Sequence, residues 1–380
     1  MLGNRKLVVD TFCEVYPLLE PWTDHTFWDF TQVTPEPGTV YVFGRQHLLD
    51  NLSLIREMAA SGDYVLVFGN SAEGAWTLEM QLKQLKIDQL VRNSQILVIA
   101  GAEVDSEYAH LTHEHFLSTI LDYEENLSAQ QHTDTIFSKS NKPYKFLFLN
   151  GRARPHRKYL YERLKRTEAL NQSLWTMLDA MPCVWRTFEF RENGIDVMAT
   201  ASPLQRLPDQ YEVSQYRDPV FGPITPSSNI KQELFRREWG EIYLEPAPYI
   251  DTYFSLVTET ICAESMYSFR TEKIAKPLTI GHPFIAVSNA GFYRDLHRLG
   301  FQTFGHVIDE SFDQIENHQD RVDRIAQIVT DLCRQDLASF LKECYNVCKY
   351  NQQHLAEVRA QTRQEFPNRF QQFIQKYCNE

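Results

Sequence analysis

The feature that most constrains the fold is an alternation of short apolar segments with amphipathic ones over the first 140 residues. Four apolar segments, each rich in β-branched residues and bounded by turns, predict strands at 6–12, 39–44, 64–69 and 95–101. Between them, residues 47–60 and 77–87 repeat apolar side chains at helical spacing. Nearly continuous apolar strands that alternate with helices predict a parallel sheet covered on both faces.

A second set of strands and helices follows residue 143. Strands are predicted at 145–150, 252–260 and 284–288, and Pro155 predicts the first turn of a helix. The polar residues 126–143 predict a linker or a long surface loop between the two sets. Residues 203–248 contain seven of the 17 prolines and predict an irregular region, whereas residues from about 315 to 378 have a helical pattern.

At 380 residues the chain exceeds one ordinary hydrophobic core, so more than one domain is expected. The two sets predict an α/β protein with two Rossmann-like domains that face each other and a helical C-terminus. We expect domains at 1–142 and 143–335, and C-terminal helices at 336–380 that pack back on the body. Because ligands of such sheets bind beyond the carboxyl ends of the strands, candidate sites lie at the strand-to-helix junctions 150–157, 259–273 and 287–291.

The composition predicts a cytoplasmic protein. A net charge of −12 gives no overall attraction to nucleic acid or to anionic lipid. No run of about 18 apolar residues predicts a membrane span, and residues 1–12 lack the apolar core of a signal peptide. The seven cysteines are odd in number and scattered, which favours reduced thiols. Cys344 and Cys348, at helical spacing, predict core packing rather than metal binding.

The first candidate junction is a basic segment, Arg152 to Arg166, which holds seven Lys and Arg residues and one acid. A helix that starts near Pro155 attracts anions through its free N–H groups and its dipole. Cations at such a position are unfavourable for folding unless an anion is present. Arg154, His156, Arg157 and Lys158 therefore predict a diphosphate site, and a solvated basic face is the alternative.

The second candidate junction is FRTEKIAK at 269–276, where charged residues open a helix. An exposed pair of Glu272 and Lys276 contributes only about 0.3–0.5 kcal/mol, too little to explain the whole cluster. A carboxylate such as that of Glu272 can instead accept both hydroxyls of a ribose, while Lys273 or Arg270 meets a phosphate. A solvated helix end is the alternative.

Taken together, the two junctions resemble a known group of enzymes. FSLVTET at 254–260, FRTEKIAKPLTIGHPFIAVSN at 269–289 and Ser311-Phe312 are similar to the C-terminal donor-binding region of the α1,3-fucosyltransferases and the related exostosin-like group. In that group a strand ending in Asn precedes an Arg, with Tyr and Leu one and two helical turns later. The corresponding residues in this sequence are Asn150, Arg157, Tyr161 and Leu164.

The resemblance covers roughly residues 145–315 and implies a GT-B glycosyltransferase, whose two Rossmann-like domains face a cleft. It implies a nucleotide-sugar site on the second domain, made by Asn150, Arg152, Arg154, Arg157, Glu259, Arg270, Thr271, Glu272 and Lys273. In this site Arg157 and Lys273 would contact the phosphates. Glu272 would contact the ribose, and Glu259 the sugar or its surroundings. Thr258, Thr260 and Arg270 depart from the group's usual residues, so the resemblance leaves the sugar and the nucleotide open.

The first domain would then supply the acceptor site and, in an inverting enzyme, a general base. Glu73 and Glu103 each follow an apolar strand and are the candidates for this catalytic role, with Asp105 beside Glu103. Solvated loop carboxylates are the alternative. The three histidines of HLTHEH at 110–115 have poor ligand spacing and predict a helix surface rather than a metal site. No Asp-x-Asp motif is present, so we expect no metal and no cofactor.

The sequence thus predicts a transferase that moves a sugar from a nucleotide-diphosphate donor to a hydroxyl of a glycan or another acceptor. Two alternatives stay open. One is transfer to a modified nucleobase in DNA, which the basic segment allows and the net charge disfavours. The other is a nucleotide- or polyanion-binding protein without catalysis.

Overall fold

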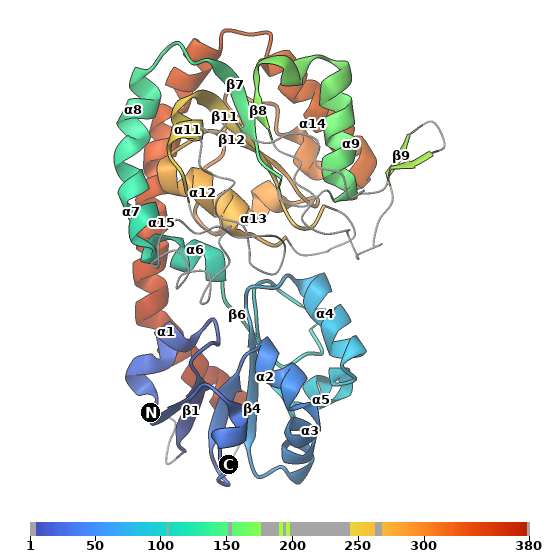
Figure 1. Cartoon of the computed structure of the whole chain (residues 1–380), viewed down its shortest axis with the longest axis vertical. Helices are drawn as coiled ribbons and strands as arrows, with labels where there is room; N and C mark the ends of the chain where they lie inside the picture. The colour runs from blue at the N-terminus through green and yellow to red at the C-terminus, as the bar shows by residue number, and fades with distance from the viewer. Residues whose placement is uncertain are drawn as a thin grey trace. The chain divides into compact units, whose positions relative to one another are not determined.

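The computed structural model describes residues 5–104, 106–150, 154–175, 190–192, 195–197, 244–262 and 268–377. The chain forms two compact units, one of residues 1–118 with 358–380 and the other of residues 119–357 (Figure 1). Each unit is built on its own parallel sheet, so the predicted α/β class and the helical C-terminus are confirmed. The predicted domains ended at residues 142 and 335, whereas the units end at residues 118 and 357. Most of the predicted irregular region 203–248 lies outside the described residues.

The first unit contains a six-stranded parallel sheet with the strand order β2-β1-β3-β4-β5-β6. Its strands are β1 (Leu7–Asp10), β2 (His25–Phe27), β3 (Val40–Phe43), β4 (Val65–Asn70), β5 (Leu97–Ala100) and β6 (His110–Thr112). The four predicted strands are confirmed as β1, β3, β4 and β5, and every residue in them is buried, as expected for a parallel sheet covered on both faces. The edge strands β2 and β6 carry polar side chains and were not predicted.

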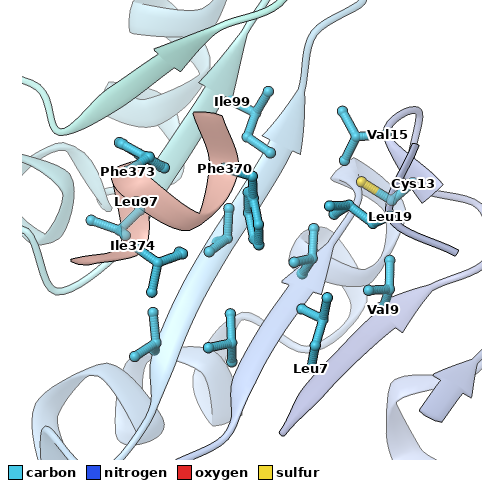
Figure 2. Packing of buried hydrophobic residues seen from close by; sticks show 14 of the residues in the cluster. Leu7, Val9, Cys13, Val15, Leu19, Leu97, Ile99, Phe370, Phe373 and Ile374 are labelled. Atoms are coloured by element: carbon cyan, nitrogen blue, oxygen red, sulfur yellow. The ribbon is translucent and has the colours of Figure 1, made fainter. Parts of the chain in front are cut away.

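Helices cover both faces of this sheet. They are α1 (Tyr16–Leu19), α2 (Arg45–Asp50), α3 (Leu52–Ser61), α4 (Ala75–Gln84), α5 (Asp88–Arg92) and the end of α15 (Leu337–Tyr377). Alternate strand residues, among them Leu97 and Ile99, form a hydrophobic cluster with Phe370 and Phe373 of α15 (Figure 2). The other strand residues point to the opposite face, where Phe43 stacks on Phe68 with ring centroids 6.0 Å apart.

The second unit contains a four-stranded parallel sheet with the order β12-β11-β7-β8. Its strands are β7 (Tyr144–Phe148), β8 (Leu174–Trp175), β11 (Thr252–Thr258) and β12 (Phe284–Val287), and β9 (Phe190–Glu192) and β10 (Ile195–Val197) form a separate antiparallel pair. The predicted strands at 145–150, 252–260 and 284–288 are confirmed as β7, β11 and β12.

The helices of the second unit include three that follow the predicted junctions, namely α9 (Pro155–Arg166), α12 (Glu272–Ile280) and α13 (Phe292–Arg298). The others are α6 (His115–Thr119), at the boundary of the two units, α7 (Glu124–Ala129), α8 (Thr133–Ser138), α11 (Ala247–Ile250), α14 (His318–Leu332) and the first part of α15. The helix predicted at Pro155 is confirmed as α9, with the proline in its first turn. Among the described helices, none combines the length and the apolar character needed to cross a membrane.

The prediction of a linker or loop at 126–143 is wrong, because α7 and α8 occupy most of this segment. The segment has little apolar periodicity, yet buried polar contacts fix it. The Thr133 hydroxyl donates to the Ile280 carbonyl over 3.0 Å, and the Gln352 side chain donates to the Thr133 hydroxyl over 2.8 Å. Its helices are therefore stabilised by tertiary hydrogen bonds, which apolar periodicity does not reveal.

The prediction of a helix surface at HLTHEH is also wrong. His110 lies in strand β6, and His113 and His115 are buried rather than exposed. Burial lowers the pKa of His113 well below its usual range, so this side chain is neutral in the core. By contrast, Cys344 and Cys348 are buried in α15, as their spacing predicted.

Candidate functional site

The candidate site lies where the strand order of the second sheet reverses. The connection through α9 leads from β7 to β8 on one side, whereas the connection through α12 leads from β11 to β12 on the other side. The carboxyl ends of β7 and β11 are therefore neighbours at a topological switch point, the position at which open α/β sheets bind ligands. The first two predicted junctions, 150–157 and 259–273, meet at this point.

Arg157 joins the two junctions. Its side chain is 2% exposed, and its Nη2 donates to the carbonyls of Thr258 and Glu259 over 3.0 and 3.3 Å. The Nε2 atom of the neighbouring His156 lies 3.1 Å from the same Glu259 carbonyl, and burial lowers the pKa of His156 well below its usual range. The Thr258 hydroxyl donates to the Asn150 side chain over 2.6 Å, so the end of β11 is bonded to residues after β7.

Glu259 is the most deeply buried carboxylate of this site, with no exposed surface. Its two oxygens accept hydrogen bonds from the Thr271 backbone N–H over 3.2 Å and from the Thr271 hydroxyl over 2.6 Å. Burial raises the pKa of Glu259 above its ordinary value, and the nearby Lys273 ammonium opposes this shift. The carboxylate thus fixes the first residues of α12 against the end of β11.

The first turn of α12 carries an ion pair. Thr271 is the N-cap, and its hydroxyl accepts a hydrogen bond from the Lys273 backbone N–H over 3.3 Å. The Lys273 ammonium lies 2.5 Å from the Glu272 carboxylate. Burial opposes ionisation of Glu272, but the charge and hydrogen bond of Lys273, together with the Lys276 charge, outweigh burial and lower the pKa of the carboxyl. Glu272 is only 6% exposed, so the alternative of a wet helix face does not apply to it.

Arg270 is buried on the other side of this turn. It is 7% exposed, and its guanidinium donates to the Ser268 carbonyl over 3.0 Å and to the Ser268 hydroxyl. That hydroxyl donates to the Asp295 carboxylate of α13 over 2.6 Å. Arg154 is the partly buried N-cap residue of α9. Arg152 lies outside the described residues.

Charged side chains of both signs gather at this switch point. In its described part, the cations are the buried Arg157 and Arg270 and the partly exposed Lys273, and the carboxylates are those of Glu259, Glu272 and Asp295. Burying a charge costs free energy unless an opposite charge or hydrogen bonds compensate it. Two helices also begin here, each with its positive dipole end at the site. An anionic ligand therefore suits the electrostatics of this switch point.

One structural residue was missed by the sequence analysis. Arg321 of α14 is 2% exposed and donates to the carbonyls of Ser288 over 2.8 Å and Glu316 over 3.1 Å, and also to those of Ile315 and Cys262. It thereby joins the third predicted junction, after β12, to the segment after β11. A single arginine in an amphipathic helix carries no sequence signal for this role.

The two candidate bases lie at different positions in the first unit. Glu73 follows β4 and is 3.6 Å from Arg45 of α2, and its side chain is 17% exposed. Glu103 follows β5, is 59% exposed, and accepts hydrogen bonds from His110 and Thr112 of β6. Asp105 lies outside the described residues. Among the described residues, no group of three or more His, Cys, Asp or Glu side chains could hold a metal ion.

Comparisons with protein-family models, with curated proteins and with solved structures found no match to this chain. The interpretation of the site therefore depends on its own geometry and charge.

Proposed function

We propose that the chain is a glycosyltransferase that moves a sugar from a nucleotide-diphosphate donor to a hydroxyl acceptor, with inversion and without a metal. We further propose that the two units act as the two halves of a GT-B enzyme. The main support is the switch point of β7 and β11, where the N-termini of α9 and α12 lie together with Arg157, Arg270 and Lys273. The negative charge of a nucleotide diphosphate would complement the two positive helix ends and these cations.

Stabilisation of the leaving diphosphate is the largest electrostatic task in such a transfer. We assign it to Arg157, Lys273 and the N-termini of α9 and α12, which gather at one end of the sheet. Glu272 would bind the ribose hydroxyls, and Glu259 would shape the surroundings of the sugar. The first unit would bind the acceptor and supply the proton acceptor, for which Glu73 and Glu103 are the candidates.

A thermal-shift screen with GDP, UDP, CDP, ADP and dTDP in excess EDTA tests the proposal. At a concentration 100-fold above its Kd, a bound nucleotide stabilises the fold by about 2.7 kcal/mol. We expect one nucleotide to stand out and its effect to persist in EDTA. Hydrolysis of the corresponding nucleotide sugar then separates an enzyme from a binding protein. Failure of all five nucleotides to stabilise the protein would exclude the proposed donor site.

Two substitutions in α12 should separate the roles of ribose and phosphate. We expect Glu272→Gln to weaken binding of the nucleotide more than binding of inorganic diphosphate, because diphosphate has no ribose. Lys273→Ala should weaken both ligands by similar factors. The matched control is Lys342→Ala, which removes an exposed lysine of α15 and should change neither affinity. Isothermal titration calorimetry measures both ligands on each variant. Equal losses for the two ligands in Glu272→Gln would contradict the ribose role.

A further inference from the structure

Two aromatic rings are exposed at the carboxyl edge of the first sheet. Phe12 is 62% exposed and follows β1, and Trp28 is 60% exposed and follows β2. The two strands are parallel neighbours, and the Thr11 N–H donates to the Phe27 carbonyl over 2.9 Å. The backbones of these two aromatic residues therefore lie side by side. Large rings that are mostly exposed forgo much of the free energy of burial, so two of them held at one edge indicate a binding surface.

A buried pair of polar residues fixes both backbones. Asp10 is 1% exposed and accepts a hydrogen bond from the Phe12 N–H over 2.8 Å. Its other oxygen lies 2.5 Å from Nδ1 of His47, which is 7% exposed. The opposite ring nitrogen, Nε2, lies 3.1 Å from the Trp28 carbonyl. Burying a carboxylate beside an imidazole is costly, and here the pair holds the two residues whose rings remain exposed.

This edge is the switch point of the first sheet. The connection from β1 leads to β2 on one side, and that from β3 leads to β4 on the other side. The Gly44 N–H, directly after β3, donates to Asp10 over 2.9 Å. The next residue, Arg45, is 48% exposed and lies 3.6 Å from Glu73. Apolar ring faces and a charged donor and acceptor are thus placed at the position where such sheets bind ligands.

We propose that this edge binds the sugar ring of the acceptor, with Trp28 and Phe12 against its apolar face and Arg45 and Glu73 near its hydroxyls. The choice of a sugar rests on the proposed function. A polyanion is disfavoured because the chain carries a net charge of −12. Asp10 and His47 are positioning residues that act through the backbones of the two aromatic residues.

Saturation-transfer NMR with a panel of methyl hexopyranosides, without any nucleotide, tests this site. We expect at least one glycoside to bind in the millimolar range and Trp28→Ala to weaken it by about 10-fold, as for an aromatic anchor of an interface. Trp28→Tyr should retain most of the affinity. The matched control is Trp22→Ala, because Trp22 is 42% exposed but precedes β2 and so lies at the opposite edge of the sheet. It should leave the affinity unchanged.

The outcomes separate this site from the donor site. His47→Gln should weaken binding of the glycoside but leave the thermal shift given by the nucleotide unchanged. A general loss of structure would reduce both. Glycoside binding without any nucleotide binding would support this site and contradict the proposed function. Absence of glycoside binding, equal effects of Trp28→Ala and Trp22→Ala, or binding of nucleosides and single-stranded DNA in place of glycosides would overturn the inference.

Discussion

Replacing Phe370 by alanine is expected to destabilise the first unit by about 3–5 kcal/mol. The Phe370 side chain is 2% exposed and lies in the cluster formed with one face of the six-stranded sheet (Figure 2). Its removal takes away buried apolar surface and leaves a cavity that rigid strands fill only in part. Since domains of this size have a total stability of about 5–15 kcal/mol, the loss is a large fraction.

Urea denaturation of the whole chain measures this change, and the exposed Gln375 of the same helix provides the control. Gln375→Ala should alter the free energy of unfolding by less than about 0.5 kcal/mol. The comparison tests whether residues 358–380 are a structural part of the first unit. A loss below about 1 kcal/mol for Phe370→Ala would mean that the sheet keeps its core without this helix.

Arg157→Ala is expected to weaken binding of the nucleotide diphosphate by about 1.5–3 kcal/mol, the range for hydrogen bonds that involve a charged group. The substitution also removes the donor to the Thr258 and Glu259 carbonyls, which ties the end of β11 to α9. We therefore expect a separate loss in the free energy of unfolding. Arg157→Lys should restore the charge but not both hydrogen bonds, because an ammonium lacks the planar fork of a guanidinium.

Calorimetry on folded protein measures the affinity, and denaturation measures stability. Arg163→Ala is the matched control, since Arg163 lies in the same helix, is 37% exposed and pairs with Asp323. It should cost no more than about 1 kcal/mol of stability and leave nucleotide affinity unchanged. If Arg157→Ala lowers stability but binds the nucleotide normally, Arg157 belongs to the scaffold alone.

The seven predicted strands could be found from sequence because their residues are apolar, β-branched and bounded by turns. The conformation and the burial of such a segment can both be predicted from its own residues, because a strand in a covered parallel sheet needs apolar side chains on both faces. The edge strands β2 and β6 escaped prediction because their polar residues have no such requirement. The helices at 124–138 escaped it because tertiary hydrogen bonds, such as that of Thr133 to Ile280, stabilise them.

The candidate site was accessible from sequence only in part. Because they are charged and lie at strand-to-helix junctions, four residues could be identified as candidates: Arg157, Glu259, Glu272 and Lys273. The structure joins them through hydrogen bonds and an ion pair. That the two junctions meet depends on β11 lying beside β7, which the local pattern does not specify. The position of the predicted bases relative to a switch point likewise depended on the strand order of the first sheet.

Local sequence pattern determined seven of the strands, the longer helices and the charged junctions of this chain, because side-chain period and turn chemistry act over a few residues. The tertiary structure determined which elements and side chains are neighbours. The Asp10–His47 pair joins residues 37 positions apart, and α15 contributes its C-terminal end to the core of the N-terminal sheet. Neither contact produces a periodic pattern in the sequence. Each depends on the burial of both partners, and the partners are buried only once the sheets have formed.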